Sequence, residues 1–280
     1  MQRFYDVSND RLIYLGKAAT EAFWDEHWNT YDLRLQFQIN RNRWGKRLRN
    51  FLGLSHNSVV TIRTKYLDSG SMILEGGCGL GQNLVDLSKE GFVPIGIDFA
   101  PQTVTKIKKA FPELEIRLGD VRDLPLNDST VDGYWSLGVI EHFWEGFDSI
   151  AKEMGRVIRG GGYLFLTFPH MSWLRKKKVR FNQYDLFQST DNPPDNFYQF
   201  ALEPLSVANS IEEKGFTLVA SHSENGLKGF KDEVSISKPV LQKLYNSRNW
   251  IAIIIKFILE PLLKPFAGHM SLMVFRRNEH

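Results

Sequence analysis

The alternation of apolar and polar positions becomes regular near Ser71. From there, short apolar runs that end near a glycine or an acid alternate with amphipathic segments of helix length. Such alternation is typical of a parallel sheet with crossover helices. The predicted strands are 72–75, 93–98, 114–118, 133–137, 163–168, 217–222 and 269–275, and the predicted helices are 81–89, 101–111, 147–158 and 204–214. The pattern therefore predicts an α/β fold.

Residues 1–70 follow a different pattern, rich in aromatic and basic residues and without a glycine-rich loop. Apolar residues alternate with polar ones from Tyr31 to Ile39, which is a strand period, whereas 23–28 and 44–54 have helical spacing. The 31–39 element stays open between strand and helix. We expect 1–70 to be a mainly helical N-terminal extension and 71–280 to be the α/β domain. This extension and the insertions at 171–200 and 223–268 are expected to build a cap over the site of the α/β domain.

Composition excludes several classes of protein. With 42% hydrophobic and 24% charged residues, the chain has the composition of a soluble globular protein, and its net charge of +3 is too small to hold it on nucleic acid by itself. The single cysteine excludes a disulfide framework and a multi-cysteine zinc site. The N-terminus has no apolar signal region, and 250–263 is shorter than the ~20 residues of a spanning helix. A cytoplasmic protein without a transmembrane segment is expected.

The strongest local signal is ILEGGCGLGQN at 73–83, in which a strand passes through a glycine-dense turn into a helix. Glycines allow a ligand to approach the backbone there. A dinucleotide fold would have G-x-G-x-x-G, but here Gly77, Gly79 and Gly81 alternate with other residues, and Gln82 stands where the third glycine would be. A glycine-rich turn without a ligand is the alternative.

Acidic residues follow the next two strands of the predicted sheet. Asp98 ends the second strand, where a carboxylate can accept both hydroxyls of a ribose, and Asp120 follows the third. Taken alone, Asp98 could be a helix cap before Pro101, and Asp120 a turn residue. Because successive strands deliver such residues to one edge of the sheet, the sequence predicts a nucleotide-like ligand across that edge.

At these residues the chain resembles the class I S-adenosylmethionine-dependent methyltransferases of the type 11 group. The motifs LEGGCGLG (74–81), GID (96–98), GDVRDLP (119–125) and RVIRGGG (156–162) stand in the family's order and spacing. The resemblance covers 72–169, 197–216 and the last strand. It implies a Rossmann-like seven-stranded sheet of order 3-2-1-4-5-7-6, with strand 7 antiparallel and helices on both faces. It also implies S-adenosylmethionine as the cofactor, and leaves a dinucleotide oxidoreductase as a distant second.

The resemblance further implies a role for each residue of this edge. Glu75 and the backbone of Gly77 and Gly79 would hold the methionine end, Asp98 the ribose hydroxyls, Phe99 would lie against the adenine, Asp120 and the amide of Val121 would read the adenine edge, and the Leu137 carbonyl would lie near the methionine amino group. Cys78 and Gly81 complete the predicted cofactor turn. Cys78 is interpreted as a small packing residue under the cofactor, since no second thiol exists.

Methyl transfer from a sulfonium is an in-line displacement, so a base is needed only where the acceptor arrives protonated. His142 is the candidate base and His170 the weaker one; alternatively, His142 only begins a helix and packs against the cofactor. Some relatives bind magnesium through Glu-x-x-Glu-His. Here Gly138 replaces the first carboxylate, so we predict no metal.

The predicted acceptor is an O, N or C atom of a small or lipid-like molecule. Aromatic residues near the acceptor side could form its wall: Trp173, Phe181, Tyr184, Phe187, Tyr198 and Phe200. Basic segments at 34–49 and 175–180 leave an RNA methyltransferase as an alternative, and a non-catalytic protein that binds the cofactor is another.

The apolar segment 250–263 needs a cover, because its isoleucines are too continuous for an exposed helix. Lys256 and Glu260 are four residues apart and would share one helix side. The cap, a second subunit and a peripheral membrane contact are the three covers considered, and the cap is favoured.

Overall fold

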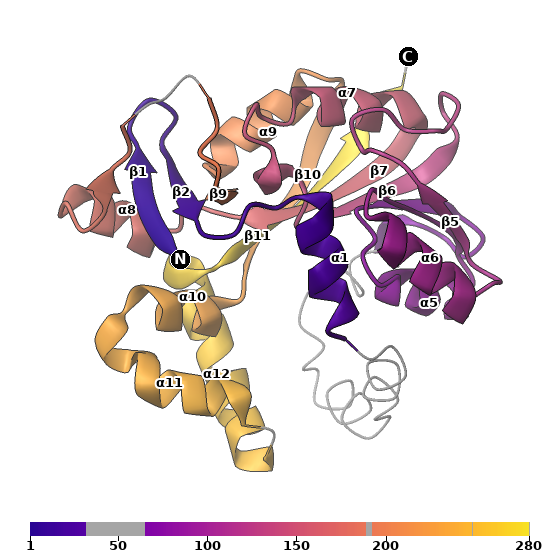
Figure 1. The fold of residues 1–280 in the computed structure, drawn as a ribbon. Coiled ribbons are helices and arrows are strands. Elements are labelled where there is room, and N and C mark those ends of the chain that lie inside the picture. The colour runs from indigo at the N-terminus through magenta and orange to yellow at the C-terminus, as the bar shows by residue number, and fades with distance from the viewer. Residues whose placement is uncertain (32–64, 189–191, 248, 280) are drawn as a thin grey trace.

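The computed structural model describes residues 1–31, 65–188, 192–247 and 249–279. Its larger sheet has the order β5-β4-β3-β6-β7-β11-β10 (Figure 1). These strands are β3 (Met72–Gly76), β4 (Val93–Asp98), β5 (Glu115–Leu118), β6 (Val131–Leu137), β7 (Ile158–Pro169), β10 (Phe216–Glu224) and β11 (Met270–Arg277). β11 is antiparallel to both neighbours, and the pairs among β3 to β7 are parallel. The predicted order is confirmed.

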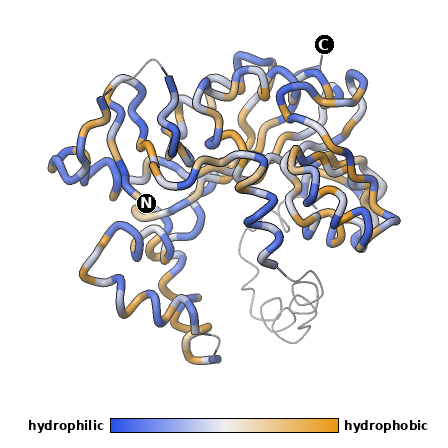
Figure 2. Tube along the Cα trace, viewed as in Figure 1, coloured by the Kyte–Doolittle hydropathy of each residue, from blue (hydrophilic) through white to orange (hydrophobic). Residues whose placement is uncertain are grey.

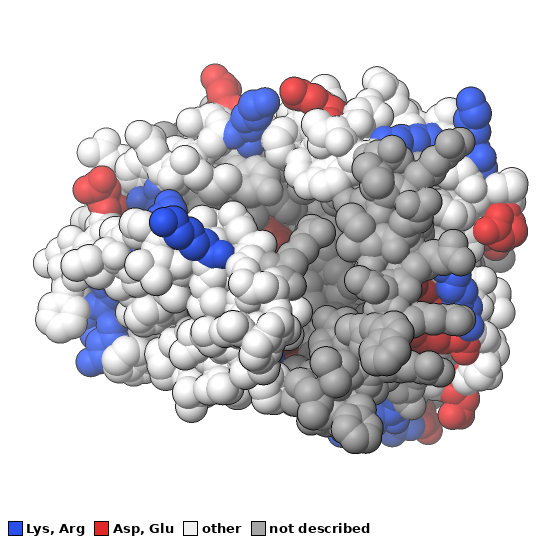
Figure 3. Space-filling view, turned by 90° about the horizontal axis from the view of Figure 1, so that it is seen from below, with Lys and Arg blue, Asp and Glu red and all other residues white. Residues whose placement is uncertain are grey.

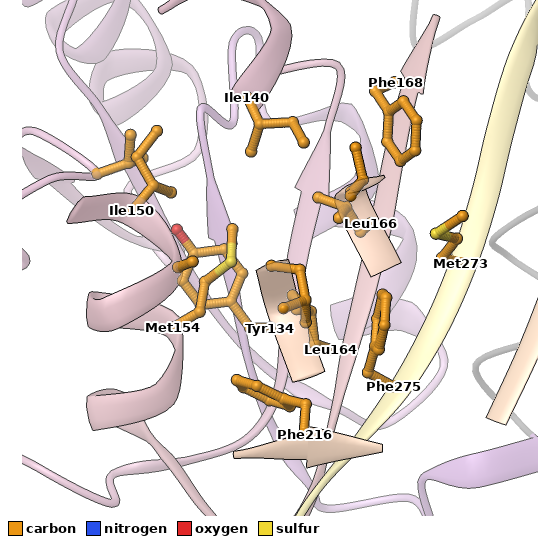
Figure 4. Close-up of a cluster of buried hydrophobic side chains, with 14 of the residues drawn as sticks. Tyr134, Ile140, Ile150, Met154, Leu164, Leu166, Phe168, Phe216, Met273 and Phe275 are labelled. Atoms are coloured by element: carbon orange, nitrogen blue, oxygen red, sulfur yellow. The ribbon is translucent and has the colours of Figure 1, made fainter. Parts of the chain in front are cut away.

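Helices cover both faces of this sheet. They are α5 (Gln82–Lys89), α6 (Pro101–Ala110), α7 (Asp148–Val157) and α9 (Pro204–Glu212), close to their predicted positions. Neighbouring residues of β6 point to opposite faces, as the strand period requires. Tyr134 packs with Met154 of α7 on one face (Figure 4), and Trp135 packs with Leu87 of α5 on the other. The long apolar runs of the sequence therefore correspond to strands buried on both sides.

A second sheet, which the sequence did not predict, has the order β8-β1-β2-β9. It joins β1 (Gln2–Asp6) and β2 (Arg11–Leu15) to β8 (Asp185–Leu186) and β9 (Phe197–Ala201). The start of the extension is thus a hairpin rather than a helix, because Leu12 and Ile13 are fully buried against β9, a partner far away in the chain. α1 (Glu21–Asn29) lies where helical spacing was noted, whereas 32–39 and 44–54 lie outside the described residues.

The insertion 223–268 forms a helical unit that projects from the sheet (Figure 1). It contains α10 (Gly226–Glu233), the short η2 (Ser235–Ser237), α11 (Lys238–Asn246) and α12 (Trp250–Ala267). In the described part of the chain, no helix is long and apolar enough to cross a membrane.

Buried ion pairs fasten this unit to the rest of the protein. The carboxylate of Glu233 accepts hydrogen bonds from Arg3 of β1 (2.7 Å), from Arg175 (3.0 Å) and Lys178 (3.0 Å) of α8 (Trp173–Arg180), and from Tyr184 (2.6 Å). Burial alone would raise the pKa of Glu233, but the guanidiniums of Arg175 and Arg3 outweigh it and lower the pKa to about 2. One carboxylate therefore joins three segments distant in sequence.

We expect Glu233→Gln to lower the free energy of unfolding by about 3–5 kcal/mol near neutral pH, because the buried guanidinium of Arg175 and the half-buried one of Arg3 lose their counter-charge. The exposed pair Arg276–Glu279 provides the control, since Glu279→Gln should cost about 0–1 kcal/mol. Urea unfolding followed by circular dichroism measures both variants. The Glu233 contribution is present above the carboxyl's unfolded pKa and is lost as the pH falls towards 2. Equal costs for the two variants would contradict this account.

Candidate functional site

A cavity of about 580 Å³ lies at the carboxyl edge of the parallel strands, within the size range of small-molecule sites. The segments after four strands contribute: Gly77 and Gly79 after β3, Asp98 and Phe99 at β4, Gly119 to Arg122 after β5, and Leu137 to Val139 after β6. Residues 18–20, Trp24 and Trp28 close one side. The edge predicted from the acidic residues and glycines is therefore hollow.

The structure brings most of the predicted residues to this cavity. Those that line it are Gly77, Gly79, Asp98, Phe99, Asp120, Val121, Leu137 and His142. Glu75, Cys78 and Gly81 do not line it. Cys78 is buried in an apolar cluster with Leu84 and Ile116, and burial raises the pKa of its thiol well above its ordinary value. That thiol is protonated at neutral pH.

The glycine turn has a left-handed backbone conformation that residues with a side chain adopt only with strain. Gly77, Gly79 and Gly81 have φ of +72°, +49° and +68°. A Cβ on Gly77 would lie 2.7 Å from Val139, and one on Gly79 would lie 2.9 Å from Trp28. The turn is also held to β4, because the amides of Gly77 and Cys78 donate to the carbonyl of Ile97.

Asp98 serves the turn as well as the cavity. Its Oδ2 accepts from the Gly79 amide at 2.8 Å, and its Oδ1 accepts from the Ala100 amide at 3.0 Å. The side chain is buried, and this burial raises the pKa of the carboxyl despite the two amide donors. Each oxygen retains a second lone pair, so Asp98 can still accept from a ligand in the cavity that it lines.

Helix α1, which belongs to the extension expected to contribute to the cap, covers the site, but sequence reasoning did not single out its residues as part of the lining. Asp25 is buried and accepts from the amide (2.8 Å) and hydroxyl (2.8 Å) of Thr103, at the beginning of α6. In return, Lys106 of α6 donates to the carbonyls of Trp28 (3.0 Å) and Tyr31 (3.0 Å) at the end of α1. Opposite charges thus lie at the two helix ends that favour them. The available signal was the i, i+4 pair Trp24 and Trp28 beside an acid.

Two buried carboxyls near the turn each have an oxygen without a partner. Glu75 Oε1 accepts from Asn83 at 2.6 Å, but its Oε2 has no partner among the described residues, and neither has Oε2 of Glu141. Burial raises the pKa of each carboxyl to about 8. Both are therefore largely protonated at neutral pH in the structure described. Glu75 lies at the end of β3, just before the glycine turn, but its side chain is behind the residues that line the cavity.

His142, in the short helix η1 (Ile140–His142), lines the cavity. Its Nδ1 lies 2.6 Å from the Tyr198 carbonyl, which can only accept, so Nδ1 carries the hydrogen and Nε2 has a free lone pair. Burial lowers the pKa of His142 to about 4, so the ring is neutral at pH 7. His170 is directed elsewhere, since its Nε2 donates to the Gly268 carbonyl at 3.0 Å and it does not line the cavity.

The other charged residues of the cavity lining are Asp120, Arg122, Glu145 and Asp195. Asp120 is bonded to Arg122 at 2.6 Å, and this hydrogen bond lowers the pKa of Asp120. Within the described residues, no three His, Cys, Asp or Glu side chains gather as a metal site.

Of the basic segment 175–180, three residues pair with acids: Arg175 and Lys178 with Glu233, and Lys176 with Glu203. The segment does not line the cavity. The other basic segment, 34–49, lies outside the described residues.

Comparison with known proteins agrees with this geometry. Residues 74–166 match the type 11 family model described as "Methyltransferase domain". A protein of Mycolicibacterium smegmatis named "Probable S-adenosylmethionine-dependent methyltransferase" is 28% identical over 160 residues, 57% of each chain. The chain spans about half the length of the relatives that it matches. The predicted resemblance to class I S-adenosylmethionine-dependent methyltransferases of the type 11 group is confirmed.

Solved structures share the fold. A SAM-dependent methyltransferase from Methanosarcina mazei aligns with a TM-score of 0.54 and 15% identity, over 78% of this chain and 98% of that one. The [4+2]-cyclase SpnF aligns with a TM-score of 0.51 and 16% identity, over 79% and 80%. At such identities the likeness concerns the fold alone.

The raised carboxyl pKa values predict how the stability of the free protein depends on pH. Because folding raises the pKa of Glu75 from 4.5 to about 8, its stabilising contribution is full below pH 4.5 and is lost as the pH rises through 8. The same holds for Glu141. We expect Glu75→Gln and Glu141→Gln each to reduce this loss by an amount on the order of a few kcal/mol. Glu113→Gln, at an exposed position, is the control. Unfolding curves between pH 5 and 9 that are parallel for all variants would show that neither carboxyl titrates in this way.

Proposed function

We propose that this chain, whose residues 74–166 form a type 11 methyltransferase domain, binds S-adenosylmethionine in the cavity and transfers its methyl group to a small or lipid-like acceptor. The observation that carries the proposal is the convergence of the glycine turn, Asp98 and Asp120 on one cavity at the carboxyl edge of the sheet. Parallel sheets bind nucleotide-like ligands at this edge.

The residues present fit the parts of this cofactor. Asp98 has lone pairs to accept the ribose hydroxyls, and Phe99 offers a ring to the adenine. Asp120 and the Val121 amide supply an acceptor and a donor for the adenine edge, and the Leu137 carbonyl an acceptor for the amino group. The buried Oε2 of Glu75 has no hydrogen-bond donor among the described residues. The ammonium group of the methionine part could donate to it, either directly or by way of the backbone of the glycine turn.

The cofactor, when bound, supplies a methyl group on a cationic sulfur, and the chain supplies position. The turn and the two acids fix the donor, while Trp24 and Trp28 of α1 exclude water from one side. Holding donor and acceptor at attack distance accounts for most of the catalytic effect in such a displacement. For a protonated acceptor, Nε2 of His142 is the candidate to take the proton.

The acceptor wall differs from the one predicted. Of the six predicted aromatic residues, none lines the cavity; Tyr184, for example, is bonded to Glu233, and Trp173 is exposed. The cavity is instead lined by other aromatic side chains, which are Trp24, Trp28, Phe99, Phe143, Trp144 and Phe197. An apolar wall of this kind favours an apolar or lipid-like acceptor over a polyanion.

The rival functions are less well supported. An RNA methyltransferase would need free cations near the cavity, but the described basic segment is largely paired with acids. A non-catalytic binder, or an enzyme of other chemistry, would keep the same fold, as the likeness to a cyclase illustrates. Incubation with cofactor labelled in the methyl group and with fractionated cell extract separates these cases. Label in lipids or small molecules supports the proposal, label in RNA favours the rival, and no labelled product favours a binder.

Calorimetry should detect binding of S-adenosylmethionine and none of NAD. Asp98→Asn should weaken cofactor binding by roughly 10- to 150-fold, the range for losing hydrogen bonds to a charged group. Asp132→Asn is the matched control, because Asp132 also accepts from a backbone amide, that of Met72 at 2.8 Å, but does not line the cavity. Equal affinities of the two variants would remove Asp98 from the proposed site.

His142→Asn tests the proposed base, because an asparagine amide can still donate to the Tyr198 carbonyl while the Nε2 position is removed. If His142 is the base, turnover should fall by about 10²- to 10⁴-fold with cofactor affinity preserved. His222→Asn, on β10 and away from the cavity, is the control. Unchanged turnover in His142→Asn would mean that the ring only packs against its neighbours.

A further inference from the structure

Helix α12 has its charged side turned towards the protein and its apolar side turned away from it. The inward charges are Lys256, Glu260 and Lys264, spaced four residues apart. Glu260 accepts from the Gly226 (2.7 Å) and Leu227 (3.0 Å) amides at the beginning of α10. Lys256 donates to the Tyr245 (3.1 Å) and Ser247 (2.7 Å) carbonyls at the end of α11. The prediction that Lys256 and Glu260 share one side is confirmed.

The opposite side of α12 is an exposed apolar stripe. Its members follow one another at helical spacing: Ile251, Ile254, Ile255, Ile258, Leu262 and Phe266. Trp250 is 71% exposed at the beginning of the helix. Figure 2 shows the hydrophobic colour along the length of α12. An amphipathic helix on a globular protein normally has the reverse orientation, so this stripe lacks the cover that its composition requires.

The cap over the site is not that cover. No residue of 223–268 lines the cavity in the part of the chain that the structure describes, and α12 extends away from the sheet (Figure 1). Figure 3 shows the molecule from the end to which this unit and α1 both point, and the described surface there is mostly uncharged, with scattered Lys, Arg, Asp and Glu side chains. The remaining covers are a second copy and a membrane surface.

Charge decides between these two. The sequence from Val234 to Leu259 contains four Lys or Arg residues and no Asp or Glu. Lys238 and Lys243 are exposed on α11, whereas Lys256 is turned inward, as Glu260 is. Two such units packed together would bring like charges together without an acidic partner in either segment. An anionic lipid surface, in contrast, attracts the basic residues and accepts the apolar stripe, with tryptophan at the depth of the head groups.

We propose that the unit α11–α12 docks on an anionic membrane surface, with the stripe from Ile251 to Phe266 inserted among the lipids. This interaction surface is separate from the cofactor cavity. The docking proposal rests on the proposed function in one respect only, which is that it would place a lipid-like methyl acceptor at the membrane. In Figure 1, α12 and α1 both extend towards the bottom of the view, and Trp24 and Trp28 of α1 line the cavity.

Flotation of the full chain without cofactor tests the docking. The probes are vesicles of phosphatidylcholine alone and vesicles in which about a third of the lipid is phosphatidylglycerol. We expect binding to the anionic vesicles that weakens as salt is raised, because the electrostatic part is screened. Lys238→Glu with Lys243→Glu should lower the bound fraction, and Lys89→Glu on α5 should not.

A matched pair of leucines tests the stripe. Leu262, 60% exposed on α12, and Leu205, 67% exposed on α9, can receive the same change. Leu262→Glu should lower vesicle binding about tenfold or more, whereas Leu205→Glu should leave it unchanged. Circular dichroism checks that each variant is folded. Calorimetry with S-adenosylmethionine on the same variants shows separately whether the proposed function holds.

Three results would overturn the docking proposal. The first is a chain that binds neither kind of vesicle, has the mass of two copies by light scattering, and becomes a monomer in the variant Leu262→Glu. That result would assign the stripe to contact with a second copy. The second is a monomer that ignores both vesicles. The third is flotation that both leucine variants retain, because the membrane would then be bound through another surface.

Discussion

The cofactor edge depends on the end of strand β4. The carbonyl of Ile97 accepts from two successive amides of the glycine turn, and the carboxylate of Asp98 accepts from a third, that of Gly79. These bonds hold a turn whose glycines have positive φ, so the edge is shaped before a ligand arrives. The same carboxylate that is offered to a ligand therefore also maintains the cavity wall. A substitution of Asp98 would therefore change both the shape of the glycine turn and the contacts available to a ligand.

The N-terminal extension is part of the same construction. Asp25 of α1 accepts from a free amide at the beginning of α6, and Lys106 of α6 donates to a free carbonyl at the end of α1. These two bonds align α1 with α6. That alignment brings Trp28 to the place where a Cβ on Gly79 would stand. The glycine is thus needed twice, once for its backbone conformation and once for the close approach of the covering helix. One wall of the cavity is therefore formed by a turn and a helix that are far apart in sequence.

Sequence reasoning succeeded where the information is local. The strands of the larger sheet show as apolar runs, and their order follows from a family resemblance carried by short motifs. It failed where a partner is distant: Leu12 and Ile13 are buried against β9, and Glu233 pairs with cations from two other segments, β1 and α8. In the site, a motif places a residue at the right turn but does not say whether its side chain faces the cavity. Glu75 lies behind the lining for that reason, whereas Trp24, which lines it, belongs to no motif.

The ionisation states of the buried groups give the free cavity an unusual character. Burial keeps Glu75 and Glu141 largely protonated and His142 neutral, whereas Asp98, Glu145 and Asp195 are further acids of the cavity lining and Asp120 is paired with Arg122. The aromatic wall suits an apolar acceptor, and a cationic cofactor would favour the ionised form of any carboxyl near it. Entry of the cation and release of a proton from Glu75 would then be coupled, since the attraction offsets the desolvation that keeps the carboxyl neutral. The part of the negative charge that comes from Glu75 would thus arise only when the cofactor is present.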